Sequence, residues 1–333
     1  MSSWLLKTGA QHIFSCLPRS DRWNELLQRH VTGGLRLEVH DEFLEKVRAC
    51  RRHLDYYETC SRRPREDFSA LEIGTGWFPI IPLGLYLCGA REIWTYDIVR
   101  LLRLDTFYTV LDYYILLYRT GELKEVLPAA IPSRVERLVQ FSSSPRKIGP
   151  EECLERLGIH ALIGDVRVTG LPQGSIDFVF SHGVLEHFPW EMLVEALKEL
   201  RRVSGQDSVM SHYLGLADQF ASFDRSITPY NFLRYSKRAW RWLDSPMIPQ
   251  NRLRISDYRT AFSGAGFVVA ASEDIRGKEE DLASIRLAPE FVQCNKDDLL
   301  VLFSWLITRP KESAMDPTRV SWSLVDERLQ TSR

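Results

Sequence analysis

An acidic residue and two glycines stand close together where the sequence has the composition of a strand, a turn and a helix start. Residues 68–79 read Phe-Ser-Ala-Leu-Glu-Ile-Gly-Thr-Gly-Trp-Phe-Pro, so an apolar run carries Glu72 near its end, and Gly74 and Gly76 follow at once. Pro79 then opens a new apolar stretch, and proline suits the first turn of a helix because its missing N–H costs nothing there. Such a turn presents backbone N–H groups and a carboxylate to a nucleotide-like ligand.

Taken alone, this turn leaves two ligands open, a nicotinamide dinucleotide and S-adenosylmethionine. A dinucleotide turn reads G-x-G-x-x-G, and its third glycine lets the helix pack close to the strand. Here Pro79 occupies the third position. Glu72 lies two residues before the first glycine, which favours a ligand that carries a positive amino group. Both features favour S-adenosylmethionine.

Two aspartates follow the next candidate strands. Asp97 ends the second strand, 25 residues after Glu72, where a carboxylate can accept hydrogen bonds from both ribose hydroxyls of an adenosine. The alternative for Asp97 is the N-cap of the following helix. Asp165 follows the third strand and is placed to reach the adenine amino group, or else it is an ordinary turn aspartate.

These residues require strands and helices that alternate. The apolar runs predict strands at 68–73, 92–97, 160–164, 176–181, 208–213, 267–274 and 298–307, and helices at about 38–60, 80–88, 100–120, 189–202 and 256–265. Strands separated by helices predict a doubly wound, mostly parallel α/β sheet. We divide the chain into an N-terminal helical cap (1–67), a main domain (68–310) with insertions at about 121–158 and 214–255, and a C-terminal tail (311–333). The arginines at 48–65 alternate with acids, which predicts a solvated helix face there.

Composition narrows the class of protein. The chain has 333 residues, 44% of them hydrophobic, and a formal net charge of −1, which disfavours a globally basic nucleic-acid binder. Six cysteines lie far apart without the Cys/His spacing of a zinc site. We therefore expect reduced thiols, a cytoplasmic protein and no metal. The apolar run near Trp4 is too short to cross a membrane, and a cap helix is favoured over an amphipathic membrane anchor.

The combination of motifs resembles class I S-adenosylmethionine-dependent methyltransferases, of the kind called type 11. The resemblance covers about residues 68–215 and rests on Leu-Glu-Ile-Gly-Thr-Gly at 71–76, on Asp97, on Gly-Asp at 164–165, and on the fourth strand followed by Val-Leu-Glu-His at 184–187. It implies a seven-stranded Rossmann-like sheet that ends in an antiparallel hairpin. It also implies that Glu72, Gly74, Thr75 and Gly76 hold the methionine portion, Asp97 the ribose, and Asp165 and Val166 the adenine, and that Ser181 lines the cofactor cleft.

Methyl transfer to an oxygen also needs a base that removes the acceptor's proton. Histidine titrates near neutrality, and His212, at the end of the predicted fifth strand, is the first candidate, before His187 and His182. His187 is equally suited to cap a helix, and His212 to be a hydrogen-bonded core residue. Asp218 and Asp224 are candidates for orienting the base or holding substrate hydroxyls, or for structuring the loop.

The segment after the fifth strand bears on the acceptor. Residues 211–236 and 250–258 resemble a bacterial subgroup associated with cell-surface glycan biosynthesis. That subgroup often carries an acidic residue and a second histidine where this chain has Gly215 and Gln219. The departure puts an acid–base role for this segment in doubt.

Cations and aromatic rings also alternate in this region. Together they can stack on sugars or bases and hold phosphate, which would suit a phosphorylated or nucleotide-linked acceptor. The alternative is an amphipathic helix with its aromatic residues turned inward. The residues are Arg234, Lys237, Arg238, Arg241, Arg252 and Arg254, with Tyr230, Phe232, Tyr235, Trp240 and Trp242.

The sequence therefore predicts an S-adenosylmethionine-dependent methyltransferase that acts on a small molecule or glycan intermediate, at a hydroxyl oxygen. An RNA or tRNA methyltransferase is the alternative enzyme, disfavoured by the near-neutral charge and by the lack of an RNA-binding module. A methyltransferase-like scaffold without turnover is the third hypothesis, motivated by Gly215 and Gln219. We expect residues 1–67 to form a lid over the cleft, and the oligomeric state stays open.

Overall fold

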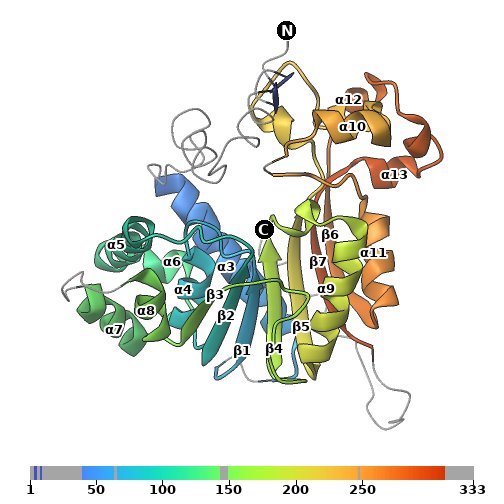
Figure 1. Cartoon of the computed structure of the whole chain (residues 1–333). Helices are drawn as coiled ribbons and strands as arrows, with labels where there is room; N and C mark the ends of the chain where they lie inside the picture. Colours follow the sequence, from blue (N-terminus) through green and yellow to red (C-terminus); the bar gives the residue numbers. More distant parts are fainter. Residues whose placement is uncertain are drawn as a thin grey trace.

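The computed structural model describes residues 4–5, 8–9, 40–63, 66–142, 149–246 and 248–311. Within these ranges seven strands form one sheet in the order β3-β2-β1-β4-β5-β7-β6 (Figure 1). Strands β1 to β5 pair in parallel, whereas β7 runs antiparallel to both β5 and β6. The predicted doubly wound sheet with an antiparallel C-terminal hairpin is confirmed. The strands are β1 (Ser69–Ile73), β2 (Glu92–Asp97), β3 (Ile159–Ile163), β4 (Ile176–His182), β5 (Ser204–Gly215), β6 (Phe267–Arg276) and β7 (Val301–Pro310).

Helices cover both faces of the sheet (Figure 1). Because side chains alternate across a strand, Phe178 and Phe180 of β4 lie in one apolar cluster and Val179 lies in another. The first cluster includes α3 (His40–Cys60), α4 (Ile80–Leu87), α5 (Leu104–Thr120), α6 (Leu123–Val126), α7 (Pro132–Ser142) and α8 (Pro150–Glu155). The second includes α9 (Trp190–Val203) and α11 (Ile255–Gly264). The position of a residue along β4 or β5 therefore decides which helical layer its side chain meets.

A third apolar cluster lies outside these two layers. It is built from the segment between β5 and α11 and from the connection between β6 and β7, with Trp4 packed against it. Its helices are α10 (Lys237–Leu243), α12 (Glu279–Ala283) and α13 (Lys296–Leu299), which Figure 1 shows gathered together beyond one end of the sheet.

Most aromatic residues of this region point inward, whereas Trp242 is 76% exposed. Phe232 and Trp240 are buried in the third cluster, whereas Lys237, Arg238 and Arg241 are exposed. The amphipathic-helix interpretation therefore describes α10 better than a stacking surface does.

Two of the cations predicted for a binding patch are structural. Arg252 donates to the carbonyls of Phe232 and Tyr235. Arg254 is buried and donates to the carbonyls of Leu216 and Val301. Neither side chain is free to hold a phosphate.

Most element boundaries lie within a few residues of the predicted ones. Strand β5 begins at Ser204 and helix α5 at Leu104, each four residues from its predicted start. Strand β5 extends to Gly215, two residues beyond the predicted end. Strand β7 begins at Val301 because residues 296–299 form α13. Most of the predicted cap, residues 10–39, and nearly all of the tail, residues 312–333, lie outside the described residues. No helix in the described ranges has the length and apolar character needed to cross a membrane.

Candidate active site

The turn after β1 needs both of its glycines. Gly74 and Gly76 have φ values of +81° and +65°, a backbone region that residues with a Cβ rarely adopt. A Cβ on Gly74 would also lie 2.5 Å from Cγ2 of Val184. Around a Cβ on Gly76, by contrast, nothing would lie within 4 Å. The turn is therefore packed on one side against Val184, in the loop after β4, and is open on the other.

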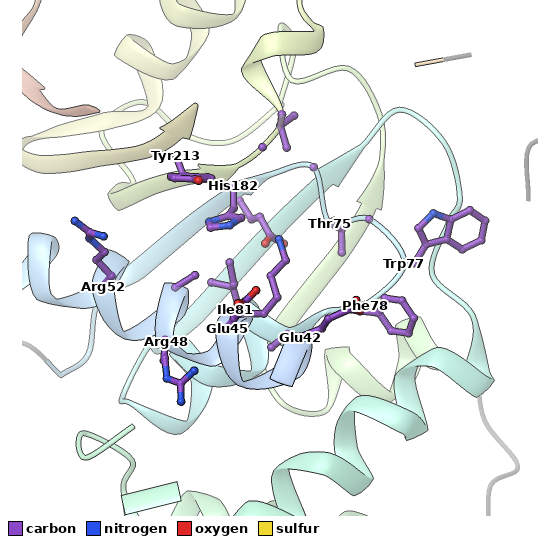
Figure 2. A pocket seen from close by; sticks show the side chains of 18 of the residues that line it. Glu42, Glu45, Arg48, Arg52, Thr75, Trp77, Phe78, Ile81, His182 and Tyr213 are labelled. Carbon is purple, nitrogen blue, oxygen red and sulfur yellow. The ribbon is translucent and has the colours of Figure 1, made fainter. Parts of the chain in front are cut away.

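The open side of the turn belongs to a cavity of about 970 Å³ at the carboxyl ends of the parallel strands (Figure 2). Open α/β sheets bind ligands at this edge. Strand β1, the turn and strand β2 contribute Glu72, Gly74, Thr75, Gly76 and Asp97. Helix α3 contributes Glu42, Glu45, Lys46, Arg48 and Arg52, and strands β4, β5 and β7 contribute His182, Tyr213 and Trp305. Figure 2 shows the α3 side chains across the cavity from His182 and Tyr213.

Glu72 has the character of a ligand-binding carboxylate. It is buried, and its Oε2 has no hydrogen-bond partner within the described part of the chain. Burial, reinforced by Asp97, raises the pKa of Glu72 well above its usual value, while Lys46 acts in the opposite sense. A buried carboxylate without a partner costs free energy. A cationic amino group beside Glu72 would remove that cost, so the site fits the amino acid portion of S-adenosylmethionine.

Asp97 is fixed by two backbone groups. Its Oδ2 accepts from the N–H of Gly76 at 3.0 Å, and its Oδ1 accepts from the N–H of Val99 at 3.2 Å. The helix that follows begins at Leu104 with Arg103 as its N-cap, so Asp97 is not a helix cap. Each carboxylate oxygen keeps a second lone pair, which is the capacity that a pair of ribose hydroxyls would use.

Thr75 holds the turn from within. Its hydroxyl donates to the hydroxyl of Thr95 on β2, with 2.6 Å between the oxygens. The Gly74 N–H donates to the carbonyl of Tyr96 at 2.8 Å. These two bonds tie the turn to β2 and fix the positions of its N–H groups.

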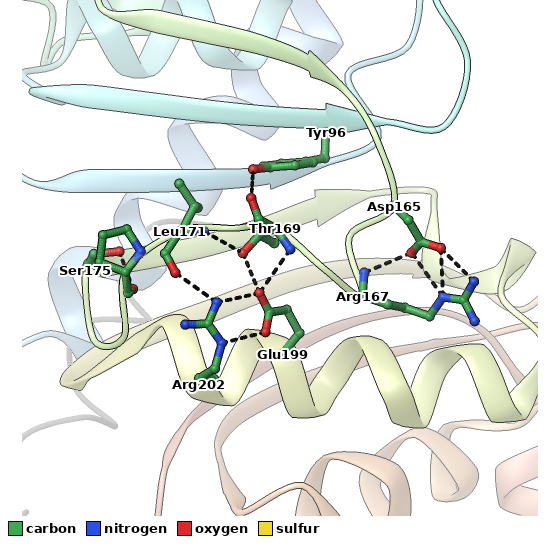
Figure 3. A network of polar contacts seen from close by, with 9 residues as sticks. Tyr96, Asp165, Arg167, Thr169, Leu171, Ser175, Glu199 and Arg202 are labelled. Atoms are coloured by element: carbon green, nitrogen blue, oxygen red, sulfur yellow. Dashed lines mark hydrogen bonds and ion pairs between the residues drawn. The ribbon is translucent and has the colours of Figure 1, made fainter.

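Asp165 lies outside this cavity. It accepts hydrogen bonds from the side chain and backbone N–H of Arg167 (Figure 3), and the guanidinium lowers the pKa of Asp165. Val166 is buried in the second apolar cluster. The adenine-binding roles of Asp165 and Val166 stay predictions.

The neighbouring polar network in Figure 3 is structural. Glu199 of α9 accepts from the N–H and hydroxyl of Thr169 and pairs with Arg202. Arg202 also donates to the carbonyl of Leu171. This network fastens the loop between β3 and β4 to helix α9.

His212, the first candidate base, does not reach the cavity. It is 0% exposed, its Nδ1 hydrogen-bonds the hydroxyl of Ser181 at 2.8 Å, and its ring packs on Phe262 of α11. Burial lowers the pKa of His212 to about 3. Strand β5 continues for three residues beyond His212, and strand alternation turns this side chain toward the α9–α11 layer. The expectation that His212 faces the cleft is therefore wrong, and Ser181 is buried with it.

The two other candidate bases, His187 and His182, line the cavity. His187 reaches it with Nδ1 hydrogen-bonded to the carbonyl of Pro249 at 2.8 Å. His182 stacks on Tyr213, with ring centroids 4.6 Å apart and an interplanar angle of 19°. The register of the sheet sets Ser181 beside Ile73, so His182 lies at the level of Gly74.

Asp218 is a loop-structuring residue in this fold. It is buried away from the cavity, caps the short 3-10 helix at residues 219–222 through the N–H of Phe220, and accepts from Nδ2 of Asn231. Asp224 is likewise buried and accepts from the backbone N–H of Trp4. Neither carboxylate lines the cavity.

Gly215 makes room for another acid. The Gly215 N–H donates to Oε1 of Glu186 at 3.1 Å, and a Cβ on Gly215 would lie 2.6 Å from that oxygen. Gln219 instead binds the carbonyl of Ile248. Position 215 therefore has no room for a side chain, because the Glu186 carboxylate occupies that space. The sequence alone did not show this contact.

Helix α3 supplies the residues that sequence reasoning missed. Arg48 and Arg52 line the cavity, and the guanidinium of Arg52 lies 4.7 Å from the ring of Trp305 and pairs with Glu273. The predicted solvated face describes Arg51 and Asp55, which form an exposed i,i+4 pair. The alternation of charges in the sequence could not distinguish the cavity-lining face of α3 from its solvated face, because which face lines the cavity depends on where α3 packs.

Residues 127–210 match the protein-family model described as "Methyltransferase domain". The match runs from the end of α6 into β5 and excludes the glycine turn. The matched residues and the glycine turn are nevertheless neighbours in space, because β4, which lies within the match, pairs with β1, which leads into the turn.

Over these residues the chain is similar to methyltransferases.

No curated protein matches this chain at a significant level. Among solved structures, the S-adenosylmethionine-dependent methyltransferase from Mesorhizobium loti is 11% identical, with 73% of this chain and 91% of that chain covered and a TM-score of 0.40. The geranyl diphosphate C-methyltransferase from Streptomyces coelicolor, solved with Mg²⁺, geranyl diphosphate and S-adenosyl-L-homocysteine, is 9% identical, with 77% of each chain covered and a TM-score of 0.42.

Proposed function

We propose that this methyltransferase transfers a methyl group to a hydroxyl oxygen of a small-molecule acceptor, with a glycan intermediate as the expected class. The observation that carries the proposal is a single cavity with two kinds of wall. One wall is the turn with the unpartnered Glu72 carboxylate; the other holds His182 and Tyr213. A donor and an acceptor can share a cavity of this size.

Three residues of the cavity would hold the cofactor. Glu72 would bind its amino group, the open face of the turn at Gly76 would accommodate the amino acid chain, and Asp97 would bind the ribose hydroxyls. When bound, S-adenosylmethionine supplies an electrophilic methyl group on a positively charged sulfur. Alignment of the two reactants in such a site is worth up to about 7–11 kcal/mol of the barrier.

The acceptor space has the charge pattern of a polar substrate site. Glu42, Glu45, Arg48 and Arg52 line it from α3. Side chains of both signs can hold hydroxyl groups and one anionic group, which supports a polar acceptor, including a phosphorylated one. The RNA alternative is less well supported, because four of the five aromatic rings that would stack on bases, all but the exposed Trp242, are packed in the third cluster.

Two measurements test the proposal. Calorimetry with S-adenosylmethionine measures cofactor binding, and mass spectrometry of a cell extract incubated with the protein and methyl-labelled cofactor identifies the acceptor. We expect binding and one labelled polar product. A folded protein that does not bind the cofactor at high micromolar concentration would refute both enzymatic functions. Binding without any labelled product would favour the scaffold hypothesis.

A further inference from the structure

Helix α10 carries two different faces. At 3.6 residues per turn, its residues fall on an inner arc and an outer arc. The inner arc holds Trp240 and Leu243, which pack in the third apolar cluster. Arg234, just before the helix, is exposed together with the outer arc. We call Arg234 and the outer arc the α10 surface. The outer arc holds the exposed side chains of Lys237, Arg238, Arg241 and Trp242.

Trp242 is the least expected residue of the α10 surface. It is 76% exposed, whereas Trp240, two residues before it, is 6% exposed. An indole has an apolar body and a polar N–H, a combination that favours the boundary between water and a bilayer. Since water leaves the apolar area of the ring uncovered, Trp242 gains free energy from a partner that accepts both parts of the ring.

The charge around Trp242 has one sign. From Arg234 to Leu243 the sequence contains four cations and no acid, although the whole chain has a net charge of −1. Within the described ranges, none of these four cations forms an ion pair. The excess of positive charge is therefore local.

The acids of this region are held by other groups. Asp244 accepts a hydrogen bond from the backbone N–H of Gln250. Glu290 pairs with Arg252 and accepts from the backbone N–H of Lys237. The cationic side chains of the α10 surface can therefore meet an anionic partner.

A bilayer fits the α10 surface better than a nucleic acid does. Single-stranded nucleic acids are held by several aromatic rings on which successive bases stack. Here the other four rings of the region are packed in the third cluster. Cations beside one exposed indole suit anionic lipid instead, because the cations meet the headgroups while the ring enters the interface.

The α10 surface lies at the end of the molecule that holds the cavity. The segment that contains α10 begins after Gly215, where β5 ends, and Figure 1 shows α10 beyond that edge of the sheet. The carbonyl of Pro249, from the same segment, binds Nδ1 of His187, which lines the cavity. A partner on the α10 surface would therefore lie at the same end of the sheet as the cavity.

We infer that the α10 surface attaches the protein reversibly to a bilayer of anionic lipid, with its cations at the headgroups and Trp242 in the interface. Each Lys or Arg near an anionic surface strengthens binding by about fivefold. The attachment therefore depends on both the cations and the indole. Helix α10 lies outside the family match at residues 127–210, and the inference stands independently of the proposed function.

Sedimentation of the full chain with vesicles tests the attachment. We expect binding to vesicles of equal parts phosphatidylserine and phosphatidylcholine, far weaker binding to phosphatidylcholine alone, and loss of binding in high salt, which screens the charges. Arg238→Gln combined with Arg241→Gln should weaken binding by about 25-fold.

The matched control combines Arg119→Gln with Arg137→Gln. These arginines are exposed on α5 and α7, so the pair makes the same change in charge elsewhere on the surface and should leave vesicle binding unchanged. Wild-type binding by the α10 variant, or an equal loss in both variants, would overturn the inference.

Tryptophan fluorescence tests the position of the indole. The wild-type spectrum minus the spectrum of Trp242→Phe should shift to shorter wavelength when phosphatidylserine vesicles are added. Trp190→Phe, at a tryptophan that is 38% exposed, should retain the shift. Absence of the shift in the wild-type protein would overturn the placement of Trp242 in the interface.

A single-stranded RNA oligonucleotide supplies the competing partner. Tighter binding to the oligonucleotide than to the vesicles, with the same dependence on Arg238 and Arg241, would overturn the bilayer in favour of a nucleic acid. None of these assays uses the cofactor or an acceptor, so their outcomes are separate from those that test the proposed function.

Discussion

Replacing Glu72 by glutamine should change folding stability and cofactor affinity in opposite directions. The buried carboxylate has an unpartnered oxygen, and burial with Asp97 raises its pKa. An acid whose pKa is raised by folding contributes stability below its unfolded pKa, and that contribution is lost as pH rises through the folded value. Without cofactor at pH 7–8, the Glu72→Gln variant should therefore be more stable than the wild-type protein.

Cofactor binding should show the reverse effect. A hydrogen bond to a charged group contributes about 1.5–3 kcal/mol, so loss of the Glu72 carboxylate should weaken S-adenosylmethionine binding by roughly 10- to 150-fold. At a cofactor concentration about 100 times the wild-type Kd, binding stabilises the wild-type protein by about 2.7 kcal/mol. The variant should gain only about 0.3–1.4 kcal/mol under the same conditions.

Chemical unfolding with and without cofactor, together with calorimetry, measures both effects. Glu136→Gln is a suitable control, because Glu136 is exposed on α7 and the substitution makes the same change in charge. We expect the control to match the wild-type protein in both measurements. Wild-type affinity in Glu72→Gln would refute the role of the carboxylate, and lower stability without cofactor would refute the electrostatic reasoning.

Three further substitutions test other parts of the site. Gly76→Ala and Gly174→Ala both add a Cβ in open space at φ of +65° and +67°, so each should lose about 1–2 kcal/mol in urea unfolding, while only Gly76→Ala should also weaken cofactor binding in calorimetry. Burial raises the pKa of Glu186 from 4.5 to about 7, so wild-type stability should fall with rising pH across that interval and Glu186→Gln should remove about 3 kcal/mol of the loss. Identical pH profiles of unfolding would contradict this. Gly215→Ala should destabilise the fold by about 1–3 kcal/mol, because its Cβ would lie 2.6 Å from Glu186 Oε1, and Glu186→Ala should relieve part of that cost.

The parts of the site set by local sequence were predictable. Glu72, Gly74, Gly76 and Asp97 could be identified because a strand, a turn and a second strand place them within a short stretch of chain. Their spacing is a property of neighbouring residues, and the sheet brings all four to one cavity.

The parts set by tertiary packing were not predictable. His212 was preferred over His182 because the predicted fifth strand ended too early, and a side chain's face depends on alternation along the strand. His53 lies in a helix whose pattern shows only that it is amphipathic, and nothing local shows that it meets Ser211 and His182. The arginines at 252 and 254 similarly resembled ligand-binding cations until their carbonyl partners were known.

The position of β7 has a consequence for biosynthesis. This strand lies between β5 and β6 although both precede it in the chain, so β6 has no strand to join until residues 301–310 have been synthesised. Until then β5 exposes an unpaired edge, a known template for wrong association. The ring of Trp305, which packs against His53, arrives with the same strand. A nascent chain therefore completes the wall behind His182 only after residues 301–310 have been synthesised, long after the glycine turn at residues 74–76.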